Sequence, residues 1–156
     1  VVNPADVKIC YSDTDCYLTC DDGLKSVLCY RNICEIDSCE YAPLNEFNSI
    51  GEDFAMSITV LGEKINLPAY FAAYGQGTFF MSMTDDAMQL YTSRLPLGYI
   101  FEKIGVVLQD SCISINGTQN CEDETHVITS TLNGEERSAS NDLLISKGDV
   151  LTIVYE

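Results

Sequence analysis

The chain has 156 residues, which suffices for one domain or for one domain with a small appendage. A hydrophobic content of 46% excludes a disordered chain, and a net charge of −16 argues against nucleic acid and anionic membranes as partners. Acidic residues are spread along the chain, so we expect most of them to be solvated surface groups.

The first nine residues, VVNPADVKI, predict an N-terminal strand or arm (residues 1–9). Val7 and Ile9 flank Lys8 in strand-like alternation, and Pro4 restricts the segment to the edge of a sheet. Such a strand either pairs within its own molecule or completes the sheet of a neighbouring subunit by β-strand addition. The residues predicted to make this assembly contact are Val1, Val2, Val7 and Ile9.

Six of the eight cysteines lie within residues 10–40 and predict a small disulfide-rich head. None has the Cys-x-x-Cys spacing of a zinc knuckle or redox pair, and His126 is the only histidine. We predict that the six pair among themselves, in an arrangement that the sequence does not select. Disulfides persist in oxidising compartments, which predicts an extracellular or cell-surface protein; a cytosolic protein of a hyperthermophile is the alternative. The six are Cys10, Cys16, Cys20, Cys29, Cys34 and Cys39.

The head also contains the acidic loop SDTDC, in which Asp13 and Asp15 occupy alternate positions. Calcium takes several oxygen ligands from a rigid loop, and disulfides supply rigidity. The chain has no complete EF-hand spacing. Calcium bound by Asp13 and Asp15 is therefore an alternative to two solvated acids, and no other cofactor is expected.

Residues 41–55 predict a connector, and residues 56–156 predict the main domain. Residues 57–70, SITVLGEKINLPAY, predict a hairpin, and residues 79–91 predict two further strands. The only predicted helix lies in RLPLGYIFEKIG, with Pro96 in its first turn and Gly105 after its end. The apolar face of this helix consists of Leu97, Ile100, Phe101 and Ile104.

Residues 112–121, CISINGTQNC, predict a hairpin closed by a disulfide. Asn116-Gly117 suits a two-residue type I′ turn, because both turn residues need a positive φ. Counting outward places Cys112 opposite Cys121 in a non-hydrogen-bonded pair, and the close approach of such pairs suits a disulfide. The alternatives are two buried thiols or half of a metal site. Asn116 also begins a glycosylation sequon at the turn tip, although the turn alone explains this residue.

The remaining segments complete an α+β prediction: a β-grasp-like, mostly antiparallel sheet with one helix, preceded by the head. TFFMSM, LPLGYIFEKIGVVLQDSCI, LNGE and ISKGDVLTIVY, in this order, resemble small secreted archaeal proteins with a ubiquitin-like β-grasp domain of the transcobalamin C-terminal type. The resemblance covers about residues 56–156 and implies a β-grasp fold and a secreted protein. The histidine pairs frequent in those proteins are missing here, and the resemblance assigns no binding residue.

Catalytic motifs are missing from the sequence, and we predict that the protein is not an enzyme. There is no Gly-x-Ser-x-Gly elbow, phosphate-binding glycine loop or His-Glu-x-x-His pair, and His126 stands alone. No apolar run reaches the ~20 residues of a membrane span, and we expect any signal peptide to have been removed. The sequence favours a structural subunit of an extracellular surface assembly or filament, self-associating by β-strand addition. The alternatives are a secreted adhesion or ligand- or cation-binding module, and a secreted hydrolase.

Overall fold

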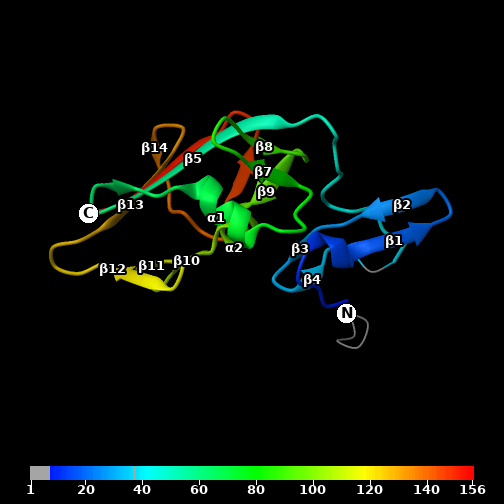
Figure 1. The fold of residues 1–156 in the computed structure, drawn as a ribbon, viewed down its shortest axis with the longest axis horizontal. Coiled ribbons are helices and arrows are strands. Elements are labelled where there is room, and N and C mark those ends of the chain that lie inside the picture. The colour runs from blue at the N-terminus through cyan, green and yellow to red at the C-terminus, as the bar shows by residue number, and fades with distance from the viewer. Residues whose placement is uncertain (1–7, 37) are drawn as a thin grey trace.

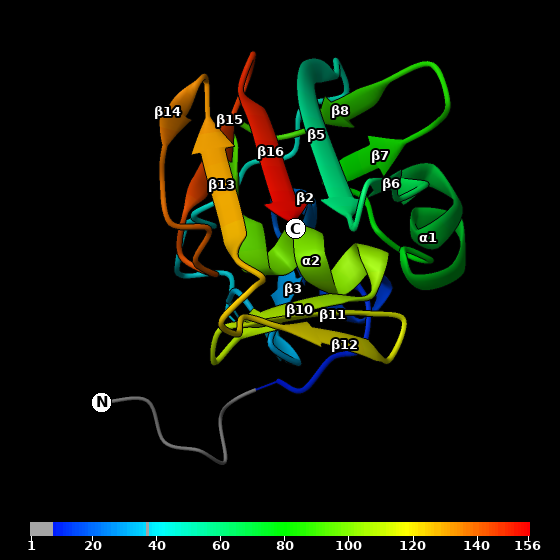
Figure 2. The same cartoon turned by 90° about the vertical axis from the view of Figure 1, so that its left-hand side faces the viewer.

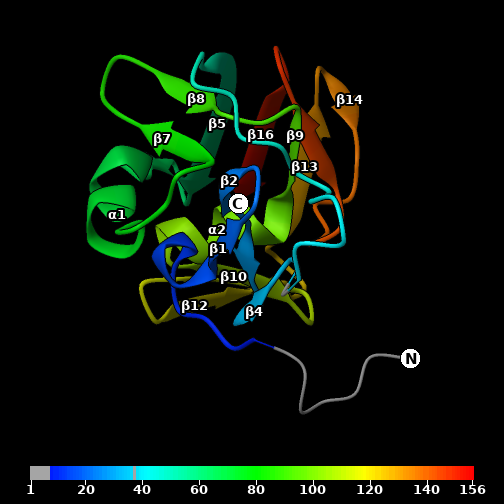
Figure 3. The ribbon, with the colours of Figure 1, turned by 90° about the vertical axis from the view of Figure 1, so that its right-hand side faces the viewer.

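The disulfide-rich head and the rest of the chain lie end to end in the computed structural model (Figure 1). The structure describes residues 8–36 and 38–156. The first strand of the large sheet begins at Glu52, so residues 41–51 are called the connector and residues 52–156 the body from here on. The connector runs along the surface from the head to this strand (Figure 3).

The head is built from two small hairpins and a 3₁₀-helix. Its elements are η2 (Asp13–Cys16), β1 (Tyr17–Cys20), β2 (Gly23–Ser26), β3 (Cys29–Tyr30) and β4 (Ile33–Cys34). β1 pairs with β2, and β3 pairs with β4. Residues 8–10 run beside β4, because the amide of Cys34 donates to the carbonyl of Lys8 and the amide of Cys10 to that of Asn32. Three disulfides crosslink these elements: Cys10–Cys29, Cys16–Cys34 and Cys20–Cys39.

The body is organised around a large mixed sheet with the order β14-β13-β16-β5-β8-β7 (Figure 2). β5 and β16 are parallel, whereas the other neighbouring strands of the sheet are antiparallel. A short seventh strand, β6, also pairs with β5. The strands are β5 (Glu52–Val60), β6 (Glu63–Lys64), β7 (Met81–Met83), β8 (Met88–Leu90), β13 (Ile128–Leu132), β14 (Glu135–Glu136) and β16 (Val150–Tyr155).

The described residues form two α-helices, so the prediction of a single helix is wrong. Helix α1 (Leu67–Tyr74) occupies the segment predicted as the end of a hairpin. Its sequence, LPAYFAAY, is apolar almost all round and therefore lacks the polar face by which a surface helix is recognised. The local start signal is nevertheless present, because the side chain of Asn66 accepts a hydrogen bond from the amide of Ala69 and Pro68 lies in the first turn.

Helix α2 (Leu97–Ile104) lies within the predicted segment and ends at Gly105. Gly105 has a φ of 67°, the left-handed conformation that favours glycine after a helix. Pro96 precedes the helix instead of occupying its first turn. The predicted apolar face is fully buried, and it consists of Leu97, Ile100, Phe101 and Ile104.

A three-stranded sheet covers the side of α2 that faces away from the large sheet (Figure 2). It consists of β10 (Val106–Gln109), β11 (Cys112–Ile115) and β12 (Thr118–Cys121). A separate pair joins β9 (Arg94–Pro96) to β15 (Leu144–Ser146). β11 and β12 pair Cys112 with Cys121, the register that the Asn-Gly turn predicts, and the two form a disulfide. Asn116 and Gly117 both have a positive φ, as a type I′ turn requires.

Candidate functional site

Asp13 lies fully buried where the head meets the body. One carboxylate oxygen, Oδ1, accepts a hydrogen bond of 2.8 Å from the amide of Cys29. The other, Oδ2, accepts from the amide of Phe79 at 3.0 Å and from the hydroxyl of Tyr99 at 2.6 Å. Hydrogen bonds to a charged acceptor are about twice as strong as those between neutral groups. Three donors can therefore compensate this buried carboxylate for its lost hydration. Asp13 therefore links an element of the head to two elements of the body.

Tyr99 is suited to donate to this carboxylate. Burial, followed by the negative charge of Asp13, holds the pKa of Tyr99 well above the ordinary tyrosine value. The hydroxyl therefore keeps its proton and donates a hydrogen bond to Asp13. Tyr99 lies on α2, and the ring of Tyr30 in β3 packs edge-on against it at a centroid distance of 6.5 Å. Gly98 permits this approach, because a Cβ at that position would collide with the hydroxyl of Tyr30.

The two acidic residues considered as calcium ligands have protein donors in the structure. Both oxygens of Asp13 accept hydrogen bonds, as described above. Oδ2 of Asp15 accepts from the amides of Tyr11 and Ser12 at 2.8 and 3.2 Å, which fixes the start of η2. These bonds give Asp13 and Asp15 structural partners and favour a structural role over a metal site.

All eight cysteines are paired, which leaves no thiol as a nucleophile or metal ligand. The Sγ atoms of Cys10, Cys16 and Cys34 lie within 4.8 Å of one another. This proximity arises because two disulfides pack side by side in the centre of the head. Every bridge stays within one part of the molecule, so the head and body are joined by the chain and by non-covalent contacts alone.

The sequon residue Asn116 lies exposed at the tip of the β11–β12 hairpin. Its amide oxygen accepts a hydrogen bond from the hydroxyl of Tyr74 at the end of α1. The ring of Tyr74 in turn lies against Gly105, where a side chain would collide with it. The contact uses the amide oxygen, whereas a glycan attaches to the amide nitrogen.

His126 belongs to a local turn. Its Nδ1 lies 2.9 Å from Oδ1 of Asp123, and its ring stacks on that of Tyr155 with a centroid distance of 5.4 Å. Hydrogen bonds from the amide of Thr125 and the ring of His126 lower the pKa of Asp123 to about 2. The hydroxyl of Thr125 also lies 2.9 Å from Nδ1 of His126 and donates to Oδ1 of Asp123, and together these contacts stabilise the turn before β13.

Of the predicted assembly residues, only Ile9 lies within the described part of the chain; Val1, Val2 and Val7 lie outside it. Ile9 is 67% exposed and forms a bridge with Ile33, which is also exposed. Because Lys8 and Cys10 direct their backbone groups toward β4, the alternation of a strand turns those of Ile9 outward. Residues 8–10 thus form an open edge of the head.

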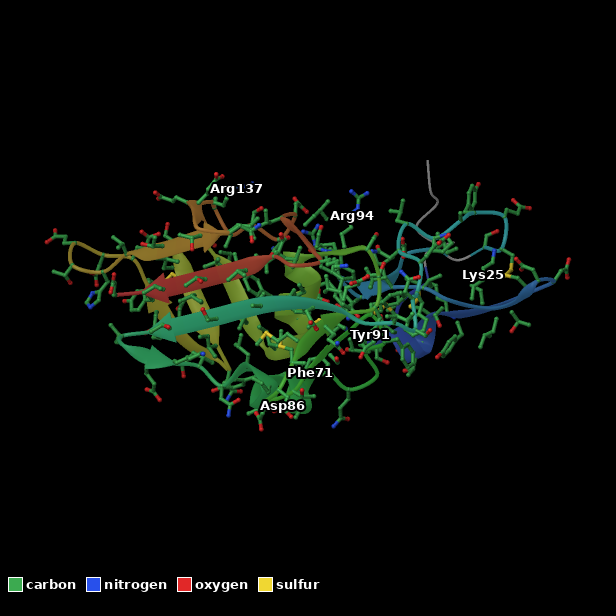
Figure 4. All side chains as sticks on the ribbon, turned by 90° about the horizontal axis from the view of Figure 1, so that it is seen from above. Lys25, Phe71, Asp86, Tyr91, Arg94 and Arg137 are labelled. Carbon is green, nitrogen blue, oxygen red and sulfur yellow. A yellow bond between two sulfur atoms is a disulfide. The ribbon has the colours of Figure 1, made fainter. Side chains whose placement is uncertain are left out.

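Exposed apolar side chains are concentrated in the head and connector. Residues 9–50 carry nine of the fifteen large hydrophobic side chains that are exposed in the described chain. In the connector they recur at every third position and are 49–86% exposed: Tyr41, Leu44, Phe47 and Ile50. Phe47 packs on the body, with its ring 6.2 Å from that of Tyr91, which Figure 4 labels near the head. The three-residue spacing is visible in the sequence, but it is typical of neither a helix nor a strand and therefore predicts no particular surface.

A pocket of about 610 Å³ opens beside β5, between α1 and the β7–β8 turn. Acidic residues at its rim include Asp53, Asp85 and Asp86, and apolar residues lie beneath them. The sequence gives no indication of this pocket, which depends on strands distant in the sequence.

Comparison with known proteins gives no match: no family model, curated protein or solved structure is significantly similar to this chain. Four disulfides indicate an extracellular protein. Among the described residues, no helix is both long and apolar enough to cross a membrane.

Proposed function

We propose that this protein is an extracellular structural subunit of a surface assembly or filament. The observation that carries the proposal is the concentration of exposed apolar side chains in the head and connector. Monomeric proteins rarely expose large apolar surfaces, and such surfaces commonly mark sites of protein association. The head and connector therefore form the contact surface between subunits, and the body is the rigid part that recurs along the assembly.

Strand addition is the proposed mode of joining. Residues 8–10 already lie at an open edge of the head, with the backbone of Ile9 directed outward. An open edge is a template for another strand, and a head-to-tail contact between identical subunits generates rings or filaments. We propose that residues 1–9 of one subunit pair with a neighbour in this way. The acidic surfaces of two subunits repel each other, but at moderate salt this repulsion is screened beyond ~8–10 Å.

The proposal includes a β-grasp body. Its support is the central parallel pair β5–β16, flanked by β6 and β13, with α2 packed against the sheet. The resemblance to small secreted archaeal proteins agrees with this arrangement. The four disulfides suit a subunit that must resist unfolding outside the cell.

The test is assembly of purified protein, measured by sedimentation and negative-stain electron microscopy. Deleting residues 1–9, or replacing Leu44 and Ile50 with serine, should abolish polymers while the thermal unfolding of the body stays unchanged. The matched control replaces Val107 and Val127, which are each 51% exposed but lie in the body. A protein that remains monomeric at high salt and high concentration, or variants that assemble normally, would contradict the proposal.

The second candidate is a secreted ligand-binding module. The pocket beside β5 is the observation that favours it, because an apolar recess of this size with a few polar groups is the usual form of a binding site. A stable monomer that retains a partner would select this function.

A further inference from the structure

The large sheet is interrupted along one edge of β5. β8 pairs with Glu52–Phe54, and β6 pairs with Thr59 and Val60, while the carbonyl of Ile58 accepts from the amide of Ile65. No strand within residues 8–36 or 38–156 pairs with residues 55–57 on this side, although β16 pairs with them on the other. The gap spans about three residues, or roughly 10 Å of extended chain.

The backbone of Met56 faces this gap. Ala55 donates its amide to the carbonyl of Asp149, on the side of β16. Backbone groups of successive strand residues point to opposite sides, so the amide and carbonyl of Met56 point to the open side. The pocket beside β5 covers the same stretch, because Ala55 and Met56 line it.

The pocket combines an apolar floor with an acidic rim. Buried or half-buried side chains form the floor: Phe54, Met56, Leu67 and Met88. The exposed carboxylates of Asp53, Asp85 and Asp86 lie at the rim, opposed by one cation, Lys64. Asp53 accepts from the side chain of Gln89 at 3.1 Å, whereas Asp85 and Asp86 take part in no ion pair within residues 8–36 and 38–156. Figure 4 shows Asp86 on the body, away from the head.

We propose that this pocket binds an extended peptide segment of a partner protein through a lysine or arginine. The peptide groups of the segment hydrogen-bond to Met56, as an added strand does. The aliphatic part of the basic side chain lies on the apolar floor, and its cation pairs with Asp85 and Asp86 at the rim. The gap admits the basic residue and one neighbour on each side. This interaction is independent of the assembly proposed above.

Three features favour a basic peptide over the other occupants. A hydrated metal ion gains nothing from an apolar floor, and a small organic cation leaves the backbone of Met56 without a partner. A second copy of this chain offers few basic side chains to this acidic rim, because it carries 8 basic residues against 24 acidic ones. A basic partner is attracted by the same charge distribution.

The test is an NMR titration of the full chain, at a concentration where it is monomeric, with the peptide acetyl-Gly-Val-Lys-Val-Gly-amide. The amide signals of residues 55–57 and 84–88 should shift. Replacing lysine by glutamine in the peptide, or methylating the peptide nitrogen that donates to the carbonyl of Met56, should weaken binding at least about tenfold. Raising the salt concentration should weaken the binding of the lysine peptide but not that of the glutamine peptide.

The protein variant Asp85→Asn/Asp86→Asn should bind the lysine peptide more weakly, by the same factor as the loss expected for the glutamine peptide. Its matched control, Glu135→Gln/Glu136→Gln, removes the same charge from β14 at the opposite end of the sheet and should leave binding unchanged. Both pairs are exposed, and an unchanged amide spectrum outside the altered turn verifies the fold.

Four results would overturn the proposal: equal binding of the glutamine peptide, equal loss in both protein variants, displacement of the peptide by calcium alone, or shifts of residues 55–57 on raising the protein concentration alone. The second result indicates general charge attraction, the third an ion site and the fourth a self-contact.

Discussion

The head and the body of this protein are held together by different means. The buried cluster of the head has five residues, four of which are cysteines: Cys10, Cys16, Val27, Cys29 and Cys34. The body cluster has 22 buried residues and a single disulfide at its margin. Covalent crosslinks therefore replace apolar burial in the head, as expected where a segment is too short to build its own core.

The head depends on the body for part of its packing and hydrogen bonding. Leu28 belongs to the head in sequence, yet it packs in the body cluster. The carboxylate of Asp13 is satisfied only in part by the head, since Phe79 and Tyr99 supply two of its three donors. Arg31 adds an amide hydrogen bond to Glu102 on α2 at 3.2 Å. The crosslinks shape the head, whereas the body fixes its position.

Truncating the centre of the body should give the largest loss of stability. Phe101 is 2% exposed, and replacing it with alanine removes a ring from between the two sheets. We expect Phe101→Ala to lower the free energy of unfolding by about 3–5 kcal/mol. Chemical denaturation measures the change, with Val127→Ala as the exposed control. A loss no larger than that of the control would show that α2 does not organise the core.

Removing the buried carboxylate tests how strongly the head depends on the body. Asp13→Ala leaves the donors of Cys29, Phe79 and Tyr99 without their acceptor, at a cost of about 1–3 kcal/mol for each that stays unsatisfied. We expect a total loss of about 3 kcal/mol, and faster hydrogen exchange in η2 and β3 than in β16. Exchange that rises equally in both parts would mean that head and body unfold as one unit.

Opening one disulfide in each part should separate the two modes of stabilisation. The body variant is Cys112→Ser/Cys121→Ser, and the head variant is Cys16→Ser/Cys34→Ser. Each variant removes a short loop closure worth about 2–3 kcal/mol. The body variant should keep its fold, because its core is intact. The head variant should lose the structure of the head, because that bridge supplies two of the five residues of its buried cluster. Amide spectra of both variants distinguish these outcomes. A head that stays well ordered without the Cys16–Cys34 bridge would show that crosslinks do not replace apolar burial there.

Local signals allowed much of the body to be predicted. The Asn-Gly turn defines the register of β11 and β12, because its geometry depends on two adjacent residues. The apolar spacing of α2 was likewise readable, because the helix is amphipathic over its own length. Helix α1 lacks such a polar face, and the β-branched run before it is typical of a strand.

The candidate sites could not be predicted in the same way, since they arise from contacts between distant residues. Asp13 and Asp15 have similar neighbours in the sequence, but only Asp13 is buried, because Phe79 and Tyr99 reach it from the body. The pocket beside β5 results from β6 and β8 pairing with different parts of one strand. The pairing of the head cysteines follows from the packing of two hairpins, which spacing alone does not determine.

The smallest expected effect concerns the pH dependence of the contact between head and body. The pKa of Tyr99 is raised in the folded protein, so its neutral form is favoured by folding. This contribution to stability is complete below the ordinary tyrosine pKa of about 10 and is lost as the pH rises above that value. Tyr99→Phe removes one of three hydrogen bonds to Asp13 and should cost about 1–2 kcal/mol at neutral pH.

The same variant should reduce the loss of stability as the pH rises above about 10, because it no longer has the phenol that must ionise. Unfolding free energies of the native protein, Tyr99→Phe and Tyr11→Phe over this range test the prediction. Tyr11 is the control, since its side chain is exposed. If Tyr99→Phe and the native protein lose stability in parallel, the buried phenol does not couple the head to the body. If only Tyr99→Phe is less sensitive to alkali, the head is held by a protonated hydroxyl of the body as well as by its own crosslinks.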